Sequence, residues 1–350
     1  MQKPVKLTPA RAWRTYIGGS QIDRIHGMEG TEDSHFPEEW IMSTVVARNA
    51  GREALEEGMC HLEGSGISLK QFLSSPDAAA LLGERHVQRW GTNTGVLVKL
   101  IDAAERLTVQ VHPDKNKAME LFHSPYGKTE CWHVLGGRSL DGEEPSIYMG
   151  FKPGITRSEW KRCFDEQDIP ALLGHMHYIP VHPGETFLIE GGVPHAIGKG
   201  CLLVEIQEPT DYTIRVERVT PNGLKVADQG CHQGLGFERM FDCFHYEGLT
   251  LEEVEARWKI PARRIDQVCE EVVGYDKTSC FRMERFEISS RYQFHRTPFC
   301  GLYVLQGSGR LDDAPLMQGD QFFVPAGSDF SLVNEGTKPL VAFACYGPQS

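Results

Sequence analysis

A twelve-residue pattern occurs twice in the chain, at residues 184–195 and 319–330. Each copy starts with glycine and an acidic residue, continues with four mostly apolar residues suited to a β-strand, and then turns through glycine. A ring side chain stands eleven positions after the first glycine, His195 in the first copy and Phe330 in the second. The repetition predicts two related β-rich units in one chain.

This pattern resembles the second motif of the cupin superfamily, whose members are small jelly-roll β-barrels with a metal site inside the barrel. His195 stands at the metal-ligand position of the first copy, in which Glu190 replaces the usual proline. The second copy keeps the proline as Pro325 but has Phe330 at the ligand position. The resemblance implies a mainly β chain with two jelly-roll barrels and additional helical segments. We expect residues 1–240 to form the catalytic, metal-binding domain and residues 241–350 a second, metal-free domain.

Local signals predict where shorter elements begin. Capping-box patterns at residues 156–159 and 250–253, Asp114, and the Ser75-Pro76-Asp77 sequence each predict the start of a helix. Apolar or alternating segments predict β structure at residues 95–101, 107–112, 178–189, 201–207, 281–291, 301–311 and 321–324.

Composition limits the classes of partner. With 36 basic and 48 acidic side chains among 350 residues, the net charge is -12, which argues against a general nucleic-acid or anionic-membrane binder but allows a small anionic substrate. The sequence contains no apolar run near the roughly 20 residues that span a bilayer and no signal-peptide pattern at the N-terminus. Ten cysteines occur singly, without a C-x-x-C pair, which predicts reduced thiols and a cytoplasmic protein. The oligomeric state is left open.

Four residues form a candidate metal site. Gln110 and His112 flank one residue of a β segment, so both side chains leave the same face. Glu130 begins another strand-like segment, and His195 comes from the repeated pattern. Two imidazoles, a carboxylate and an amide suit a borderline ion such as Zn²⁺, with room for water or substrate.

A second histidine group could also bind metal. His175 and His177 form an H-x-H pattern, and His182 follows closely. Alternation along a strand would place the first two on one face, although such histidines more often lie on a polar outer face.

The segments around these residues resemble a known family, type I mannose-6-phosphate isomerase (phosphomannose isomerase). The resemblance is clear between about residues 95 and 217 and includes the Q-V-H-P-D and K-x-E motifs, and weaker similarity extends to Trp13-Arg14 and to the expected C-terminal barrel. The clear segments are residues 98–103, 109–115, 126–132, 194–198 and 205–211.

The resemblance implies a zinc-dependent enzyme of carbohydrate metabolism that interconverts mannose 6-phosphate and fructose 6-phosphate through an enediolate, with one Zn²⁺ per chain. Matched position by position, the implied zinc ligands are Gln110, His112, Glu130 and His195. Lys128 matches an active-site lysine, and Arg215 matches the catalytic arginine. Thr108 stands where many members have a serine near the phosphate, so Thr108, Lys128 and Arg215 are the expected substrate contacts. The chain departs from the family at residues 216–218, Val-Glu-Arg, which leaves that part of the pocket wall in question.

Two alternatives stay open: an isomerase of another hexose or hexose phosphate, and a non-catalytic cupin that binds a sugar phosphate. Within the isomerase hypothesis, Arg215 is expected to stabilise charge, because a guanidinium with a pKa above about 12 is a poor base. The proton is expected to move through Lys128 or a water at the metal.

Overall fold

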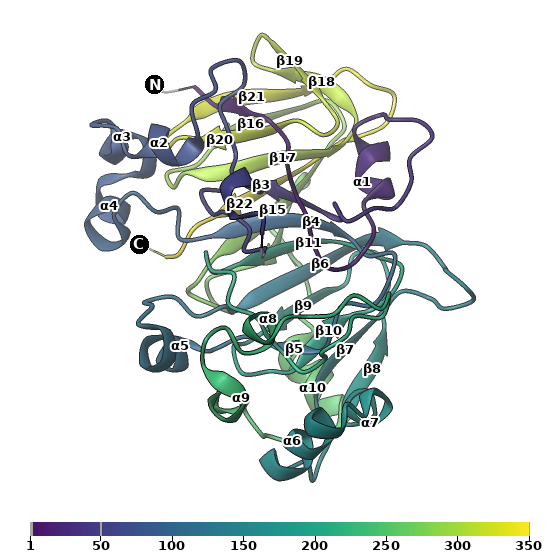
Figure 1. Ribbon diagram of the computed structural model, residues 1–350. Coiled ribbons are helices and arrows are strands. Elements are labelled where there is room, and N and C mark those ends of the chain that lie inside the picture. Colours follow the sequence, from purple (N-terminus) through teal and green to yellow (C-terminus); the bar gives the residue numbers. More distant parts are fainter. Residues whose placement is uncertain (1–2, 50, 350) are drawn as a thin grey trace.

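The computed structural model describes residues 3–49 and 51–349, and its architecture is mainly β. Strand pairing is antiparallel within four separate sheets, and no closed barrel is formed by the hydrogen-bonded strands of the described residues. Figure 1 shows the sheets as successive layers, with the four- and seven-stranded sheets above and the six- and five-stranded sheets below. The prediction of a mainly β chain is therefore confirmed, whereas the division into two jelly-roll domains stays a prediction. The four- and seven-stranded sheets are called the upper unit below, and the six- and five-stranded sheets the lower unit.

The lower unit contains two sheets. The six-stranded sheet has the order β2 (Ala10–Ala12), β3 (Glu38–Ile41), β4 (Leu97–Asp102), β11 (Cys201–Gln207), β6 (Glu130–Gly137) and β9 (Thr186–Ile189). The five-stranded sheet has the order β12 (Ile214–Arg215), β5 (Gln110–Val111), β10 (His195–Ile197), β7 (Ser146–Phe151) and β8 (Met176–Pro180).

The upper unit also contains two sheets. The seven-stranded sheet has the order β1 (Val5–Leu7), β20 (Gln321–Val324), β17 (Cys300–Gln306), β22 (Leu340–Tyr346), β15 (Arg282–Ile288), β14 (Cys269–Val273) and β13 (Arg263–Arg264). The four-stranded sheet has the order β16 (Arg291–His295), β21 (Asp329–Asn334), β18 (Ser308–Leu311) and β19 (Ala314–Met317).

Short helices flank the sheets. Near the N-terminal third lie α1 (Ser20–Ile25), η1 (Glu53–Leu55), α2 (Leu69–Leu73), α3 (Ala78–Leu82) and α4 (Glu84–Trp90). Around the five-stranded sheet lie α5 (Lys115–Phe122), α6 (Arg157–Glu166), α7 (Ile169–Gly174), α8 (Asp228–His232), α9 (Gly236–Arg239), η2 (Met240–Cys243) and α10 (Leu251–Trp258).

Three of the four apolar cores among the described residues lie between sheets, and the fourth lies between the five-stranded sheet and the helices α6, α7 and η2. The first lies between the six- and five-stranded sheets and includes Trp132 and Met149. The second lies between the seven- and four-stranded sheets and includes Phe330, whose ring stacks on Phe294 with centroids 4.7 Å apart. A third core joins the six- and seven-stranded sheets and includes Trp40. Position 330, where the repeat predicts no metal ligand, is thus part of an apolar core.

Two segments pack against the unit to which the expected domain boundary does not assign them. β1 pairs with β20 through Val5 and Phe323, so the first strand belongs to the upper unit, whereas Val254 and Trp258 of α10 pack into the lower core. Hydrophobic patterning shows which face of a strand is buried but does not identify its pairing partner. The expected domain boundary near residue 240 stays a prediction.

Most predicted element starts agree with the structure. Asp114 caps α5, accepting a hydrogen bond from the Lys117 backbone nitrogen, and Thr250 forms the expected capping box. Thr156 caps α6, but the reciprocal Glu159 hydrogen bond of a capping box is not present there. The expected cap at Ser75 is wrong, since α3 starts after Asp77.

Four predicted β segments are shorter than expected or divided. Residues 281–291 are interrupted after Ile288, and residues 301–311 divide at Gly307 into β17 and β18. Residues 178–189 divide into β8 and β9 because the chain turns between them, with Gly184 at a φ of 91°. Of residues 107–112, only Gln110 and Val111 are paired as a strand.

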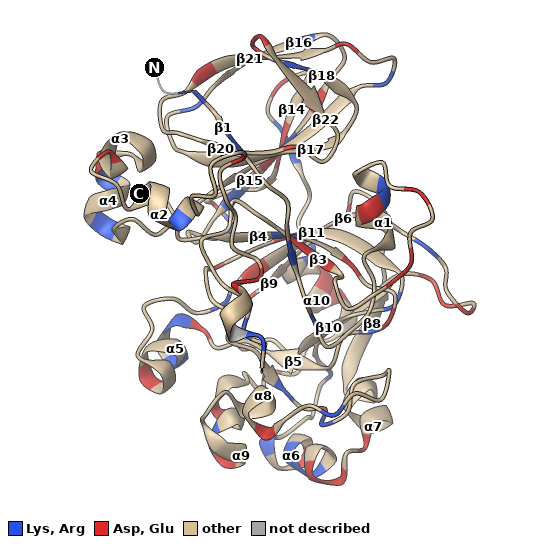
Figure 2. Ribbon diagram, turned by 45° about the horizontal axis from the view of Figure 1, so that its top comes forward, with Lys and Arg blue, Asp and Glu red and all other residues tan. Residues whose placement is uncertain are grey.

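The surface and the thiols agree with the composition. Figure 2 shows acidic and basic residues together on α5 and α6. All ten cysteines are buried and free, as expected for reduced core thiols. No helix within the described ranges is both long and apolar enough to cross a bilayer.

Candidate active site

The lower unit brings the candidate metal ligands together at the junction of its sheets. β10 pairs with β5 so that His195 lies opposite Gln110, and Glu130 enters from the start of β6. The Nε2 atom of His112 lies 3.2 Å from Oε2 of Glu130, and Nε2 of His195 lies 3.3 Å from Oε1. Donor atoms at about 2.0–2.2 Å from a tetrahedral Zn²⁺ are separated by about 3.3–3.6 Å. The spacing therefore fits a divalent cation held between the three side chains.

Backbone carbonyls orient both imidazoles. His112 Nδ1 lies 2.8 Å from the Tyr212 carbonyl oxygen, and His195 Nδ1 lies 2.9 Å from that of Val193. A carbonyl can only accept, so each Nδ1 carries the hydrogen and each Nε2 has a free lone pair. The Nε2 of His112 accepts from Lys128 Nζ, and that of His195 accepts from Gln110 Nε2. Burial and the Lys128 ammonium lower the pKa of His112 to about 3, and burial lowers the pKa of His195. Both rings are thus neutral, as metal ligands must be.

Glu130 is completely buried, and neither carboxylate oxygen has a hydrogen-bond partner. Burial alone would raise its pKa, but Lys128 and the two histidines outweigh that effect and hold the pKa well below its usual value. Lys128 Nζ lies 3.2 Å from Oε2 of Glu130. Two carboxylate oxygens that are buried and accept no hydrogen bond are unusual in proteins, and a bound cation would satisfy them.

Gln110 completes the candidate ligand set. Its Nε2 lies 3.2 Å from Nε2 of His195. The nitrogen and oxygen of a side-chain amide exchange places by a simple flip, so the same side chain can present its oxygen to a cation. The four predicted ligands are therefore adjacent.

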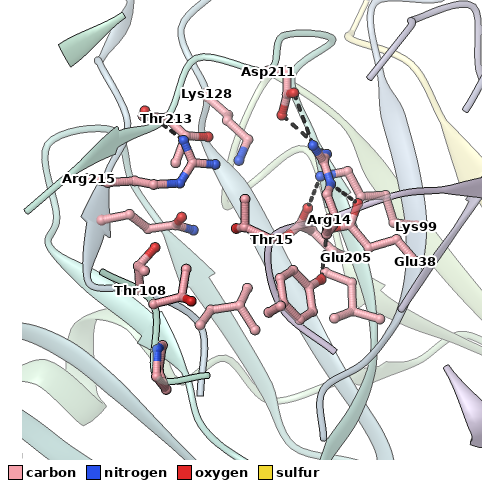
Figure 3. A pocket seen from close by; sticks show the side chains of 16 residues that line it. Arg14, Thr15, Glu38, Lys99, Thr108, Lys128, Glu205, Asp211, Thr213 and Arg215 are labelled. Carbon is pink, nitrogen blue, oxygen red and sulfur yellow. Dashed lines mark hydrogen bonds and ion pairs between the residues drawn. The ribbon is translucent and has the colours of Figure 1, made fainter. Parts of the chain in front are cut away.

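The predicted substrate contacts line one pocket beside this cluster. Thr108, Gln110, Lys128 and Arg215 all face the pocket. Figure 3 shows Arg215 and Lys128 on one side, with Arg14 and Asp211 across from them. Lys128 connects the pocket to the metal cluster, because its Nζ lies 2.8 Å from Nε2 of His112.

Arg215 is held by the backbone. Its Nη1 donates a hydrogen bond of 2.8 Å to the Gly230 carbonyl, and among the described residues no carboxylate forms an ion pair with its guanidinium. Its second amino group and Nε are therefore available to an anionic ligand in the pocket.

The opposite wall is a buried ionic network to which the sequence analysis assigned no role. Arg14 Nε donates to Glu38 at 2.9 Å, and its two amino groups lie 3.3 Å from the Asp211 carboxylate. Lys99 Nζ lies 2.8 Å from Glu205. The available signal was the weak similarity at Trp13-Arg14 together with the 205–211 motif, but neither indicated that these segments meet.

Two of the residues that depart from the family pattern after Arg215, Glu217 and Arg218, stabilise the pocket wall without facing the pocket. Glu217 is buried and accepts hydrogen bonds from Arg106 at 2.6 and 2.9 Å and from the Val109 backbone nitrogen at 2.6 Å. The Arg218 guanidinium lies 4.3 Å from the centroid of the Phe237 ring. These side chains fix the strand that carries Arg215 without lining the pocket.

The alternative histidine group is not assembled. His177 is buried and its Nε2 lies 2.8 Å from the Leu249 carbonyl oxygen, while His182 is exposed in the turn after β8. His175 precedes β8 and lies beside Glu159 and Cys163 instead. The three histidines therefore do not form one site among the residues that the structure describes.

Comparison with known proteins places this arrangement in a family. No family model matches the chain. It is 31% identical over 240 residues to "Probable mannose-6-phosphate isomerase GmuF" of Bacillus subtilis, covering 68% of each protein. The chain belongs to the mannose-6-phosphate isomerase family. A mannose-6-phosphate isomerase of Streptococcus mutans is 30% identical over 239 residues, with 66% of this chain and 68% of the relative covered.

Solved structures of the mannose-6-phosphate isomerase family share the fold. The Bacillus subtilis mannose 6-phosphate isomerase superposes with a TM-score of 0.69 at 22% identity, covering 99% of this chain and 100% of that one. The apo enzyme from Salmonella typhimurium gives a TM-score of 0.73 at 14% identity over 100% of both chains. The structural similarity extends to the upper unit, where the sequence resemblance was weak.

Proposed function

We propose that this protein is a zinc-dependent mannose-6-phosphate isomerase that interconverts mannose 6-phosphate and fructose 6-phosphate through an enediolate. The observation that carries the proposal is the buried His112–Glu130–His195 cluster, in which neither Glu130 oxygen accepts a hydrogen bond. Within this proposal the two sheet pairs are cupin-type jelly rolls, divided near residue 240, and only the first holds metal.

The ligand chemistry supports zinc. His112, His195, Glu130 and Gln110 offer two neutral imidazoles, one carboxylate and one amide, a set suited to a borderline divalent ion. When bound, such an ion stabilises negative charge that develops on substrate oxygens. A single charged ligand leaves the site with a net positive charge, which favours an anionic sugar.

The remaining residues act on the substrate directly. Isomerisation removes a proton from C2 of the aldose, delivers one to C1 and moves a proton between the two oxygens, so no external oxidant is needed. Lys128 faces both the pocket and the cluster, and we assign it the proton transfer. Arg215 stabilises charge on the reacting oxygens, because its guanidinium stays protonated. Thr108 is buried in the pocket wall, and its hydroxyl donates a hydrogen bond to the phosphate.

A coupled assay tests the proposal. Metal-replete protein should convert mannose 6-phosphate to fructose 6-phosphate, chelation should abolish turnover, and Zn²⁺ should restore it. Each charge-assisted phosphate contact is worth about 1.5–3 kcal/mol, so kcat/KM for free mannose should be lower by at least about tenfold per contact.

Other outcomes discriminate among the alternatives. Equal efficiency on free and phosphorylated mannose would refute the phosphate assignment and favour a free-sugar isomerase. A different preferred hexose phosphate would favour another isomerase. Tight binding of sugar phosphates without turnover of any of them would identify a non-catalytic binding protein.

A further inference from the structure

We propose that Glu159, Cys163 and His175 form a second metal site that takes a borderline divalent cation such as Zn²⁺. The group lies outside the pocket, on α6 and at the end of α7. The mechanism uses none of its three members.

Helix geometry places two of the donors together. Glu159 and Cys163 are four residues apart on α6, so their side chains share one helix face. His175 is the C-terminal capping residue of α7, where the chain turns into β8. All three ligand atoms lie within 4.8 Å of one another. In the sequence, His175 belongs to an H-x-H pattern with His177. Its proximity to α6 is a tertiary contact, which the sequence pattern does not indicate.

The distances match metal ligation. His175 Nε2 lies 3.6 Å from Cys163 Sγ and 3.6 Å from Glu159 Oε1. With Zn–N near 2.1 Å and Zn–S near 2.3 Å, two donors on a tetrahedral ion are separated by about 3.6 Å. The nitrogen–sulfur separation therefore already has the value that a shared zinc ion requires. A water would fill the fourth position.

Cys163 would bind the ion as a thiolate. Burial raises the pKa of its thiol, so the cation itself must favour the ionised sulfur. Cys163 is buried, whereas the side chains of His175 and Glu159 are 23% and 39% exposed, so an ion can enter from solvent. The Arg162 guanidinium lies 3.8 Å from Sγ and stabilises a negative sulfur. Binding releases the thiol proton to solvent as the sulfur–metal bond forms.

Arg162 does not prevent Glu159 from binding a cation. It pairs with Glu159 at 2.8 Å, but it also contacts Glu166 one turn further along α6. If Glu159 turns to a metal, Arg162 keeps the Glu166 carboxylate as its partner. When Glu159 moves from Arg162 to the metal, neither Glu159 nor Arg162 is therefore left without an oppositely charged partner.

An ion here would join α6, α7 and β8. β8 pairs with β7, and β7 pairs with β10, which carries His195. The proposed ion therefore stabilises the outer edge of the sheet that carries Gln110 and His195, and it acts as a structural metal.

Cobalt(II) separates this site from the active-site cluster. A thiolate ligand gives Co²⁺ a near-ultraviolet charge-transfer band, and the active-site cluster contains no cysteine. The full-length protein titrated with Co²⁺ should show this band, and His195→Ala should keep it. Cys163→Ser and His175→Asn should lose it, while the control Cys243→Ser, at another buried thiol of the same unit, should retain it.

Glu159→Gln provides a variant in which the thiol and the fold are retained, because position 159 is partly exposed. It should weaken Co²⁺ binding measured by the band at least about tenfold, equivalent to about 1.4 kcal/mol. Absence of the band in the wild-type protein, or its persistence in both Cys163→Ser and His175→Asn, would overturn the proposal. Neither result bears on isomerase activity, which the coupled assay measures separately.

Discussion

Replacing Arg14 with methionine should destabilise the protein strongly, because the side chain neutralises two buried carboxylates. Arg14 contacts Glu38 at 2.9 Å and Asp211 at 3.3 Å. The side chain of Arg14 is 8% exposed, that of Glu38 5% and that of Asp211 7%. Methionine keeps much of the volume but removes the charge and the hydrogen bonds. Glu38 would retain hydrogen bonds from Tyr16 at 2.7 Å and Trp40 at 2.8 Å, so its charge remains only partly compensated.

Two estimates of the magnitude agree. Burial alone would raise the pKa of Glu38, but Arg14 and Lys99 outweigh burial and lower it from 4.5 to about 2. At about 1.4 kcal/mol per pH unit, this difference contributes about 3 kcal/mol at neutral pH. Breaking one side of a buried ion pair costs about 3–5 kcal/mol. We therefore expect the free energy of unfolding of Arg14→Met to fall by roughly 3 kcal/mol.

The pH dependence has a definite sign. A depressed carboxyl pKa stabilises the fold above the unfolded-state pKa, and this stabilisation is lost as the pH falls toward about 2. In Arg14→Met the pKa of Glu38 rises. The wild type loses the stabilisation from ionised Glu38 between about pH 4 and pH 2, whereas the variant lacks this stabilisation already at neutral pH. The variant's stability should consequently depend less on pH in that window.

Urea denaturation at neutral pH measures the effect. Lys117→Met is a control of the same chemical change at an exposed pair, where Lys117 contacts Glu120 at 2.7 Å, and it should cost under about 1 kcal/mol. If Arg14→Met folds poorly, the cycle with Glu38→Gln still tests the argument, since neutralising Glu38 should cost less in the Arg14→Met background than in wild type. A loss below about 1 kcal/mol, or a coupling near zero, would refute the reasoning.

Four further variants test the site and the second copy of the repeat. His195→Ala should lose the active-site metal in elemental analysis, whereas Phe330→Ala should keep it and instead lower stability by about 3–5 kcal/mol through an apolar cavity. Arg215→Ala should retain metal and fold but lose most of kcat, because its guanidinium meets charge that grows toward the transition state; a change in KM alone would contradict this role. Lys128→Met should abolish turnover with both free and phosphorylated mannose if the lysine moves the proton, and loss of phosphate preference alone would reassign it to the phosphate.

The candidate ligands were predictable because each comes from a local pattern. Gln110 and His112 flank one β residue, Glu130 starts a strand, and His195 belongs to the repeated turn. Patterns of this kind depend on side-chain alternation and turn chemistry, which neighbouring residues determine. Strand pairing then brings His195 opposite Gln110.

The ionic wall of the pocket was not predictable in the same way. Arg14 and Asp211 are separated by 197 residues, and neither segment has a periodicity that indicates the other. A buried arginine also looks like a surface arginine in sequence until its carboxylate partners are known. The imidazole orientations were equally hidden, because they depend on the carbonyls of Tyr212 and Val193.

The charges of the pocket explain how an acidic protein can attract an anionic substrate. The described residues of the pocket and the metal cluster supply four cationic side chains, Arg14, Lys99, Lys128 and Arg215, and four carboxylates, Glu38, Glu130, Glu205 and Asp211. Their formal charges cancel, so a divalent cation in the proposed cluster would leave a surplus of about two positive charges, which equals the charge of a phosphate dianion. Repulsion from the net surface charge of -12 decays within a Debye length of about 8 Å at physiological ionic strength. Affinity for a sugar phosphate should therefore depend on these buried charges and on the metal far more than on the charge of the surface.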